Sequence, residues 1–136
     1  MLMSKKVLIV EDDRLIGEIY RQRLSRAGYE VEVAMSGQKA LDRLPEFRPD
    51  ALLVDLMLPQ MNGIALMKRI RALPEFKDVP IIVSTNAFLG EMIKDSIEAG
   101  ATKVFNKSTL TPPLLLEVLR EFFPVQSEEE QSLRQS

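Results

Sequence analysis

Cysteine and histidine are both absent from this chain of 136 residues. Without cysteine there is no disulfide framework and no thiol chemistry, a composition typical of a cytoplasmic protein. Without histidine the chain has no Ser-His-Asp apparatus, no histidine metal site and no phosphohistidine of its own. If phosphoryl transfer occurs here, the donor must therefore be another molecule.

Long apolar runs and an excess of positive charge are missing as well. No uninterrupted apolar stretch approaches the ~18 residues that span a bilayer, so no membrane association is expected. Residues 1–6 lack the longer apolar stretch and the cleavage site of a signal peptide. The net charge of −2 argues against a nucleic-acid-binding surface, because such surfaces are strongly basic.

The composition is that of one globular domain, with 46% apolar and 28% charged residues. We expect this domain to cover residues 1–124. The tail over residues 125–136 is mostly Gln, Ser, Glu and Arg, which bury too little surface to become ordered alone. We expect the tail to be flexible.

The chain does contain a fivefold alternation of short apolar strands with amphipathic helices. The predicted strands cover residues 6–10, 30–34, 51–54, 80–84 and 103–106. The first, third and fourth are apolar throughout, which favours central parallel strands, and the second alternates acidic with apolar residues, which favours an edge. The pattern predicts an α/β fold, a flavodoxin-like (βα)5 three-layer sandwich with parallel strand order 2-1-3-4-5.

Helix boundaries are predicted from caps and prolines. The second helix should begin at the N-cap Ser36 and run through Leu44, where Pro45 closes it. The fifth should have Pro113 in its first turn, with Pro112 extended just before it. Apolar stripes at helical spacing mark the other helices: Leu15, Ile16, Ile19, Leu24 and Ala27; Leu66, Met67, Ile70 and Leu73; Met92, Ile93, Ile97 and Ala99.

Acidic residues follow two of the central strands where those strands end. Glu11, Asp12 and Asp13 follow the first strand, and Asp55 follows the third. In the predicted strand order these strands flank the point where the order reverses, which is where open α/β sheets bind ligands. We therefore expect these carboxylates to form one site.

Carboxylates that lie this close together repel unless a proton or a cation intervenes. Oxygen ligands in an open site suit Mg²⁺ or Mn²⁺, which would let a carboxylate attack phosphorus. Thr85 ends the fourth strand, where its hydroxyl could donate to a phosphoryl oxygen. Lys107 ends the fifth, where its ammonium could form an ion pair with the phosphoryl group or with Asp55.

Each residue also has a simpler interpretation. Asp12 or Asp13 could only cap the first helix, and Asp55 could only belong to a turn. Thr85 alone is a common strand former, and Lys107 alone is typical of a solvated surface. All of them, however, fall at the same end of neighbouring strands, which favours the joint site.

These residues, with their spacing, resemble the receiver domain of response regulators in two-component signalling, of the chemotaxis-regulator type, over about residues 4–123. The resemblance rests on Val-Glu-Asp-Asp at 10–13, Asp55 with Pro59 and Gly63, Thr85 after Pro80, Gly100-Ala101 and Lys107.

The resemblance implies Mg²⁺ held by Asp12, Asp55 and the backbone carbonyl of Met57, with Glu11 supporting through water. It implies phosphorylation of Asp55 by a phosphohistidine of a sensor histidine kinase or histidine phosphotransfer protein. Thr85 and Lys107 would read the phosphoryl group. The chain would then be a phosphoacceptor rather than an enzyme, with a downstream protein target.

The chain departs from the family at several positions. Ser108 stands where the family has proline in a cis peptide, and Val104, followed by Phe105, stands where it has an aromatic switch residue. Asn86 replaces a small residue. Met57 and Ala87 offer no polar group to orient an attacking water, so we expect slow loss of the phosphoryl group.

Three functions remain open from the sequence. The first is a stand-alone switch whose fourth helix, fifth strand and fifth helix bind a partner or a second copy of the chain. The second is a phosphorylation-independent interaction module, or a receiver cut from a larger regulator. The third, a hydrolase with Asp55 as nucleophile, would need an acid where Met57 stands, and we disfavour it.

Overall fold

The computed structural model describes residues 4–86 and 90–124, which form alternating strands and helices. The strands are β1 (Lys6–Val10), β2 (Glu30–Ala34), β3 (Ala51–Asp55), β4 (Ile81–Thr85) and β5 (Lys103–Asn106). The helices are α1 (Arg14–Arg26), α2 (Gly37–Phe47), α3 (Gly63–Arg71), the 3₁₀ turn η1 (Pro74–Phe76), α4 (Gly90–Ala99) and α5 (Pro112–Phe122).

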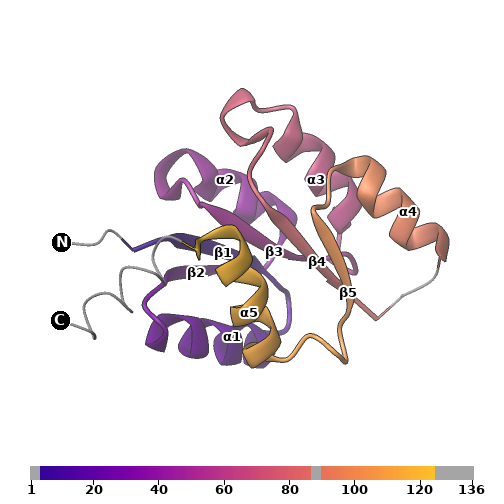
Figure 1. Ribbon diagram of the computed structural model, residues 1–136. Coiled ribbons are helices and arrows are strands. Elements are labelled where there is room, and N and C mark those ends of the chain that lie inside the picture. The colour runs from indigo at the N-terminus through magenta and orange to yellow at the C-terminus, as the bar shows by residue number, and fades with distance from the viewer. Residues whose placement is uncertain (1–3, 87–89, 125–136) are drawn as a thin grey trace, which may run out of the picture.

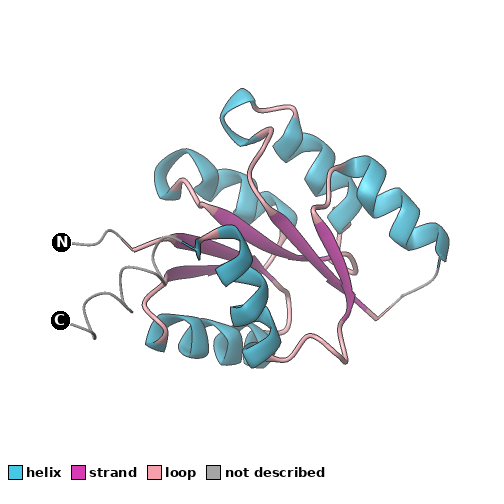
Figure 2. Cartoon of the chain, in the orientation of Figure 1, coloured by secondary structure: helices cyan, strands magenta, loops and turns pink. Residues whose placement is uncertain are grey.

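The strands form one parallel sheet in the order β2-β1-β3-β4-β5, which confirms the predicted fold class and strand order. Helices α2, α3 and α4 cover one face and α1 and α5 the other, giving three layers (Figures 1 and 2). The pairings Val10 with Val54 and Asp55 with Ser84 keep the strand ends in line. Side chains that follow these strands therefore meet at one edge of the sheet.

The core lies on both sides of the central strands. All five residues of β3 and of β4 are buried, because helices cover both of their faces. Strand β2 lies at the edge, as its alternating pattern predicted, and only Ala34 in it is buried. No helix among residues 4–86 and 90–124 is long and apolar enough to cross a bilayer.

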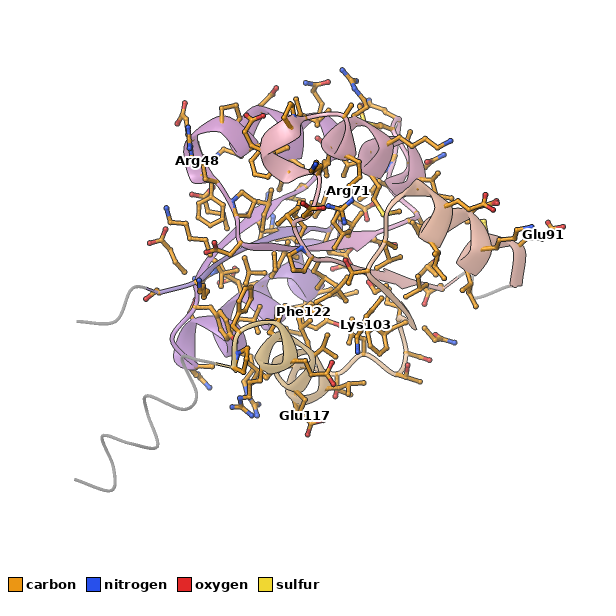
Figure 3. The ribbon with its side chains drawn as sticks, turned by 45° about the horizontal axis from the view of Figure 1, so that its top comes forward. Arg48, Arg71, Glu91, Lys103, Glu117 and Phe122 are labelled. Carbon is orange, nitrogen blue, oxygen red and sulfur yellow. The ribbon has the colours of Figure 1, made fainter. Side chains whose placement is uncertain are left out.

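Arg71 joins several loops at the opposite end of the sheet. The Arg71 side chain is labelled in Figure 3. Its guanidinium donates to the carbonyl of Gly100 over 2.6 and 3.1 Å and to that of Phe76 over 2.8 Å. Gly100 has φ +118°, a left-handed conformation that glycine adopts without strain. These bonds tie the ends of α3 and α4 together, and burial lowers the pKa of Arg71.

Two predicted helix boundaries are wrong. Helix α2 does not close at Pro45 but continues to Phe47, with Pro45 inside it. Phe47 is 4% exposed, so its packing in the core offsets the hydrogen bond that proline cannot donate. Pro112 is not extended before α5 but is its first residue, and Thr111 is the N-cap. The first N–H groups of a helix need no partner within the helix, so proline is tolerated there.

The apolar stripes of the helices are only partly buried. Leu15 and Ile19 in α1 are 69% and 49% exposed, whereas Tyr20 and Leu24 face the core. Gly17 lets α1 approach β2, because a Cβ there would lie 3.0 Å from Val33. Helix α1 is thus turned slightly from the predicted orientation. Leu73 and Ile97, which also belong to the predicted stripes, are exposed as well.

Candidate functional site

The predicted acidic residues meet at the carboxyl edge of the sheet. Glu11 and Asp12 follow β1 and Asp55 ends β3, and one oxygen of each lies within 4.8 Å of the others. Glu11 and Asp55 are each 3% exposed, while Asp12 is exposed at the rim. The predicted convergence of these carboxylates is confirmed.

The loop after Asp55 folds closely over the end of β3. A Cβ at Gly63 would lie 2.7 Å from the Asp55 carbonyl oxygen and from the Leu56 Cα, so only glycine fits. The Gly63 N–H donates to the Leu56 carbonyl over 2.9 Å. Asn62 caps α3 by accepting from the Ala65 N–H over 2.9 Å. These contacts fix the path of the chain between Asp55 and the start of α3.

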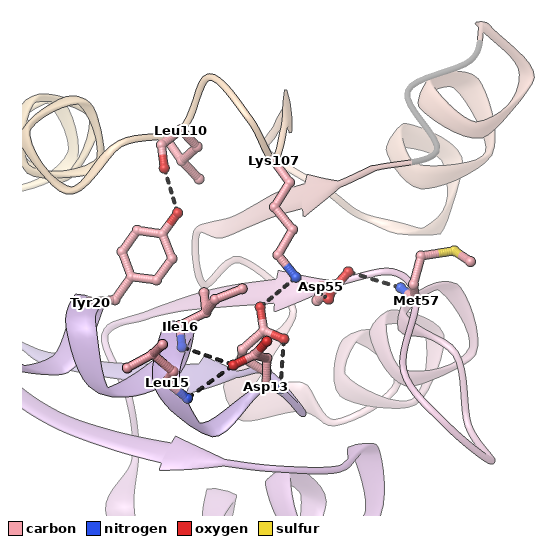
Figure 4. A network of polar contacts seen from close by, with 9 residues as sticks. Asp13, Leu15, Ile16, Tyr20, Asp55, Met57, Lys107 and Leu110 are labelled. Atoms are coloured by element: carbon pink, nitrogen blue, oxygen red, sulfur yellow. Dashed lines mark hydrogen bonds and ion pairs between the residues drawn. The ribbon is translucent and has the colours of Figure 1, made fainter.

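Lys107 is the cation of the site. Its Nζ lies 2.7 Å from Asp55 Oδ2 and 2.7 Å from Glu11 Oε1 (Figure 4). Its backbone N–H donates to the Thr85 carbonyl over 3.0 Å, which anchors the residue to the end of β4. The sequence interpretation of Lys107 as a solvated surface lysine is therefore wrong, since the ammonium bridges two buried carboxylates.

The other oxygens of the buried carboxylates accept backbone N–H groups. Glu11 Oε2 accepts from Asp13 N over 3.0 Å, and Asp55 Oδ1 accepts from Met57 N over 3.0 Å. Each of the four oxygens therefore accepts at least one bond from the described residues. Carboxylate oxygens can accept more than one bond, so lone pairs remain for a ligand.

Burial and charge act against each other on the ionisable groups. Burial raises the pKa of Glu11, the negative charge of Asp55 adds to this, and the bond from Lys107 opposes it. Burial alone would lower the pKa of Lys107, but its bonds to Asp55 and Glu11 outweigh burial and raise that pKa. Lys107 therefore stays an ammonium at neutral pH.

Asp12 and Asp13 have different surroundings although they are adjacent. Asp13 caps α1, because its Oδ1 accepts from Leu15 N over 3.0 Å and from Ile16 N over 3.1 Å. The helix-cap interpretation thus holds for Asp13. Asp12 belongs to the acidic group that could hold a metal.

Thr85 and Met57 border the site from two other segments. Thr85 ends β4 and is fully buried at the same edge of the sheet. Met57 follows Asp55 by two residues and is 58% exposed. Asn86 is exposed beside them, and Ala87 lies outside the described residues. The Lys107–Ser108 peptide, where the family has a cis proline bond, is trans.

The site opens into a cleft of about 550 Å³. Its acidic end continues along α1 and the start of α5, where Ile16, Ile19, Tyr20 and Pro112 line it. None of these residues was predicted as part of the site. Ile16 and Ile19 were assigned to the apolar stripe of the first helix, and Tyr20, one helical turn after Ile16, lies on the same face.

The donor set suits a small divalent cation. Carboxylate oxygens are the ligands that Mg²⁺ prefers, and two ligands on opposite sides of this ion lie about 4.2 Å apart. The separation of up to 4.8 Å among the three carboxylates is close to that span. The residues present therefore fit Mg²⁺ or Mn²⁺.

Comparison with known proteins agrees with this geometry. The family model for the response regulator receiver domain matches residues 7–120. The polar-differentiation response regulator DivK of Brucella ovis is 30% identical over 120 residues, covering 88% of this chain and 97% of that protein. Response regulator MprA of Mycobacterium bovis is 42% identical over 83 residues, which are 61% of this chain. The chain spans only 35% of the length of MprA.

Among solved structures, the chemotaxis response regulator CheY4 of Vibrio cholerae superposes with a TM-score of 0.81 at 32% identity. The match covers 88% of this chain and 98% of that one. The match to the family model extends over most of the chain and includes every residue of the acidic site. The chain therefore belongs to the family of response regulator receiver domains of two-component systems.

Proposed function

We propose that Asp55 accepts a phosphoryl group from a phosphohistidine of a partner protein, in a reaction that needs Mg²⁺ or Mn²⁺, and that this modification switches a protein-interaction surface. One observation carries the proposal: Asp55 is buried among two further carboxylates and a bridging ammonium at the mouth of a cleft. A protein with a purely structural role would not require this arrangement, because burying charged groups lowers the stability of the fold.

The reaction would exchange one bond to phosphorus for another. A carboxylate oxygen of Asp55 attacks, the P–N bond to the donor imidazole breaks, and the imidazole leaves with a proton. Asp12, Asp55 and the backbone carbonyl of Met57 would hold the metal, with Glu11 supporting through water. When bound, the ion would screen the negative charge of the phosphoryl oxygens from the carboxylates.

Lys107 would exchange partners during this step. Its ammonium now bonds Asp55 Oδ2 and Glu11 Oε1, and the new phosphoryl oxygens would offer it a more strongly charged acceptor than Asp55. The Thr85 hydroxyl would bind another phosphoryl oxygen. Because the Lys107 N–H is bonded to the Thr85 carbonyl, the two residues would move together.

The output surface would be α4, β5 and α5, either for a partner or for a second copy of the chain. On β5, Val104 packs against the core below α2, α3 and α4, while Phe105 packs toward α1 and α5. No aromatic side chain of β5 therefore stands at the family's switch position. The shift would pass instead through the backbone of Thr85 and Lys107.

The lack of an aromatic side chain at the switch position of β5 also favours a second candidate function. This candidate is a receiver-fold interaction module that works without phosphorylation. Whether this chain acts alone is likewise a proposal. DivK is matched over nearly its whole length, which supports a stand-alone protein, while MprA is matched over about a third of its length. Receiver sequences like this one thus occur in both contexts.

The donor must reach Asp55 through the cleft, because Asp55 is 3% exposed. Two exposed apolar residues line the cleft, namely Ile19 on α1 and Met57 after β3. A sensor histidine kinase or histidine phosphotransfer protein would cover these residues with an apolar surface while its phosphohistidine enters the cleft.

The test is incubation with Mg²⁺ and acetyl phosphate, followed by intact mass measurement of the wild type, Asp55→Asn and Asp50→Asn. Asp50 is the matched control, because its carboxylate binds the Lys6 N–H away from the acidic site. We expect one phosphate on the wild type and on Asp50→Asn, lost in hydroxylamine, and none on Asp55→Asn. An unmodified wild-type protein that also fails to bind Mg²⁺ would favour the phosphorylation-independent module.

A further inference from the structure

The loop between β5 and α5, residues 107–111, carries Lys107 and is shaped by Asn106, the last residue of β5. The Asn106 side-chain oxygen accepts from the Ser108 N–H over 3.0 Å and from the Ser108 hydroxyl over 2.9 Å. The Asn106 carbonyl accepts from the N–H groups of Thr109 and Leu110 over 3.0 and 3.2 Å. These bonds lie within residues 106–110, so they fix the shape of the loop but not its position above the acidic site.

The position of the loop depends on bonds to other elements. At one end the Lys107 N–H binds the Thr85 carbonyl of β4. At the other end the Tyr20 hydroxyl of α1 donates to the Leu110 carbonyl, across 90 residues of sequence (Figure 4). Tyr20 is 6% exposed and Leu110 2%, so losing this bond would leave a buried carbonyl without its partner.

The Tyr20 ring lies beside the functional groups. Tyr20 lines the same cleft as Lys107, Glu11 and Asp55. Burial raises the pKa of Tyr20, so its hydroxyl remains protonated and can donate. The bonds of Lys107 to Asp55 and Glu11, both 2.7 Å long, weaken if the loop moves by about 1 Å. The bond from Tyr20 to Leu110 therefore restrains the same loop whose movement would weaken the ion pairs of Lys107.

The bond from Tyr20 adds to the restraint that Asn106 gives the loop. Proline at position 108 would fix φ through its ring, whereas Ser108 is held by hydrogen bonds to the Asn106 side chain. We propose that Tyr20 is a positioning residue for Lys107: its hydroxyl, through the Leu110 carbonyl, holds the β5–α5 loop where the ammonium bridges Asp55 and Glu11. The effect of Tyr20 on phosphoryl transfer rests on the proposed function, but its effect on Lys107 does not.

Tyr20→Phe tests the inference, because it removes the hydroxyl and keeps the ring. Tyr29→Phe is the matched control. Tyr29 is the other tyrosine of the chain and is also buried, but its ring packs near Phe123, away from the acidic site.

The first measurement is the hydrogen exchange rate of the Lys107 ammonium protons, by NMR of the metal-free protein. Tyr20→Phe should accelerate this exchange about fivefold to tenfold, the factor that one hydrogen bond supplies. Tyr29→Phe should leave it unchanged. Equal exchange in the wild type and in Tyr20→Phe overturns the inference, and so does equal acceleration in both variants.

The second measurement is the rate of phosphorylation by acetyl phosphate at saturating Mg²⁺. Tyr20→Phe should slow it about fivefold to tenfold in the wild-type background and have no further effect in Lys107→Met. The same slowing in both backgrounds contradicts an action through Lys107. If the wild type takes up no phosphate, the proposed function fails, and the exchange measurement alone decides the role of Tyr20.

Discussion

Lys107 and Asp55 form an ion pair of 2.7 Å although 52 residues separate them in the sequence. The same ammonium lies 2.7 Å from Glu11, so one positive charge neutralises part of the charge of two buried carboxylates. In this arrangement Lys107 supplies the positive charge that a metal would supply when bound. Stability, metal affinity and phosphoryl transfer should therefore all depend on this residue.

Lys107→Met should destabilise the metal-free protein by about 3 kcal/mol, because it leaves Glu11 and Asp55 facing each other without a cation. The loss should become smaller when Mg²⁺ is added, since the metal would replace the missing charge. Urea unfolding with and without Mg²⁺ measures both values. A loss that is the same in both conditions would contradict a shared electrostatic role.

Mg²⁺ should stabilise the wild type by about 2.7 kcal/mol at a concentration one hundred times its dissociation constant. Asp12→Asn should abolish this gain, because it removes a carboxylate from the group that would hold the ion. Asp13→Asn is the matched control, since an amide oxygen can still cap α1. Thermal unfolding with Mg²⁺ and then with a chelator measures the effect. Equal gains in both variants would argue against Asp12 as a ligand.

The sheet and the convergence of the carboxylates were predictable because both depend on local patterns. Apolar runs mark β1, β3 and β4, and the acids stand directly after two of those runs. The parallel arrangement of these strands then brings Glu11, Asp12 and Asp55 together at the carboxyl ends of the strands, and no knowledge of side-chain packing is needed to predict this. From the sequence, Lys107 was expected to pair with Asp55 or with a phosphoryl group, and the pair with Asp55 is present. Its second bond, to Glu11, was not predicted, since it depends on the position of the β5–α5 loop.

What could not be predicted depends on packing between distant segments. The bond between Tyr20 and Leu110 joins residues 90 positions apart, and it requires a particular rotation of α1. The same rotation exposes Leu15 and Ile19, which local spacing assigned to an apolar stripe. Pro45 stays inside α2 because Phe47 beyond it packs in the core, a tertiary effect that the local proline rule does not include.

The stability of the metal-free protein should fall as pH rises through two windows. The pKa of Glu11 is raised by burial above its ordinary 4.5, so the folded state binds more protons than the unfolded state just above pH 4.5. The raised pKa of Lys107 contributes stability that is complete below pH 10.5 and is lost above it. Urea unfolding across pH, compared with Glu11→Gln, measures the first window. An identical pH dependence in Glu11→Gln would exclude Glu11 as its source.

Ile19→Asp should reduce phosphotransfer from a phosphorylated histidine donor protein at least about tenfold, the effect of placing a charge in an apolar interface. It should leave the rate with acetyl phosphate unchanged, because the Asp55 carboxylate is held by Lys107 and Met57, whereas Ile19 is half-exposed on α1. Ile97→Asp is the matched control, since Ile97 is 56% exposed on α4. A loss of the acetyl phosphate reaction would instead place Ile19 in the reacting site.

Phosphorylated Asp55 should lose its phosphate slowly, because Met57 places an apolar side chain at the cleft where water must attack. Met57→Asn would add an amide able to orient that water, so dephosphorylation should become several times faster. The backbone N–H of residue 57 still binds Asp55 in this variant, so the carboxylate keeps its orientation. Ile97→Asn is the control, since Ile97 is exposed on α4 to about the same degree as Met57 and does not line the acidic cleft. The measurement is the decay of phosphoprotein mass in Mg²⁺ after removal of the donor. A wild-type half-life of seconds, or equal acceleration by Ile97→Asn, would show that Met57 does not limit the attack of water.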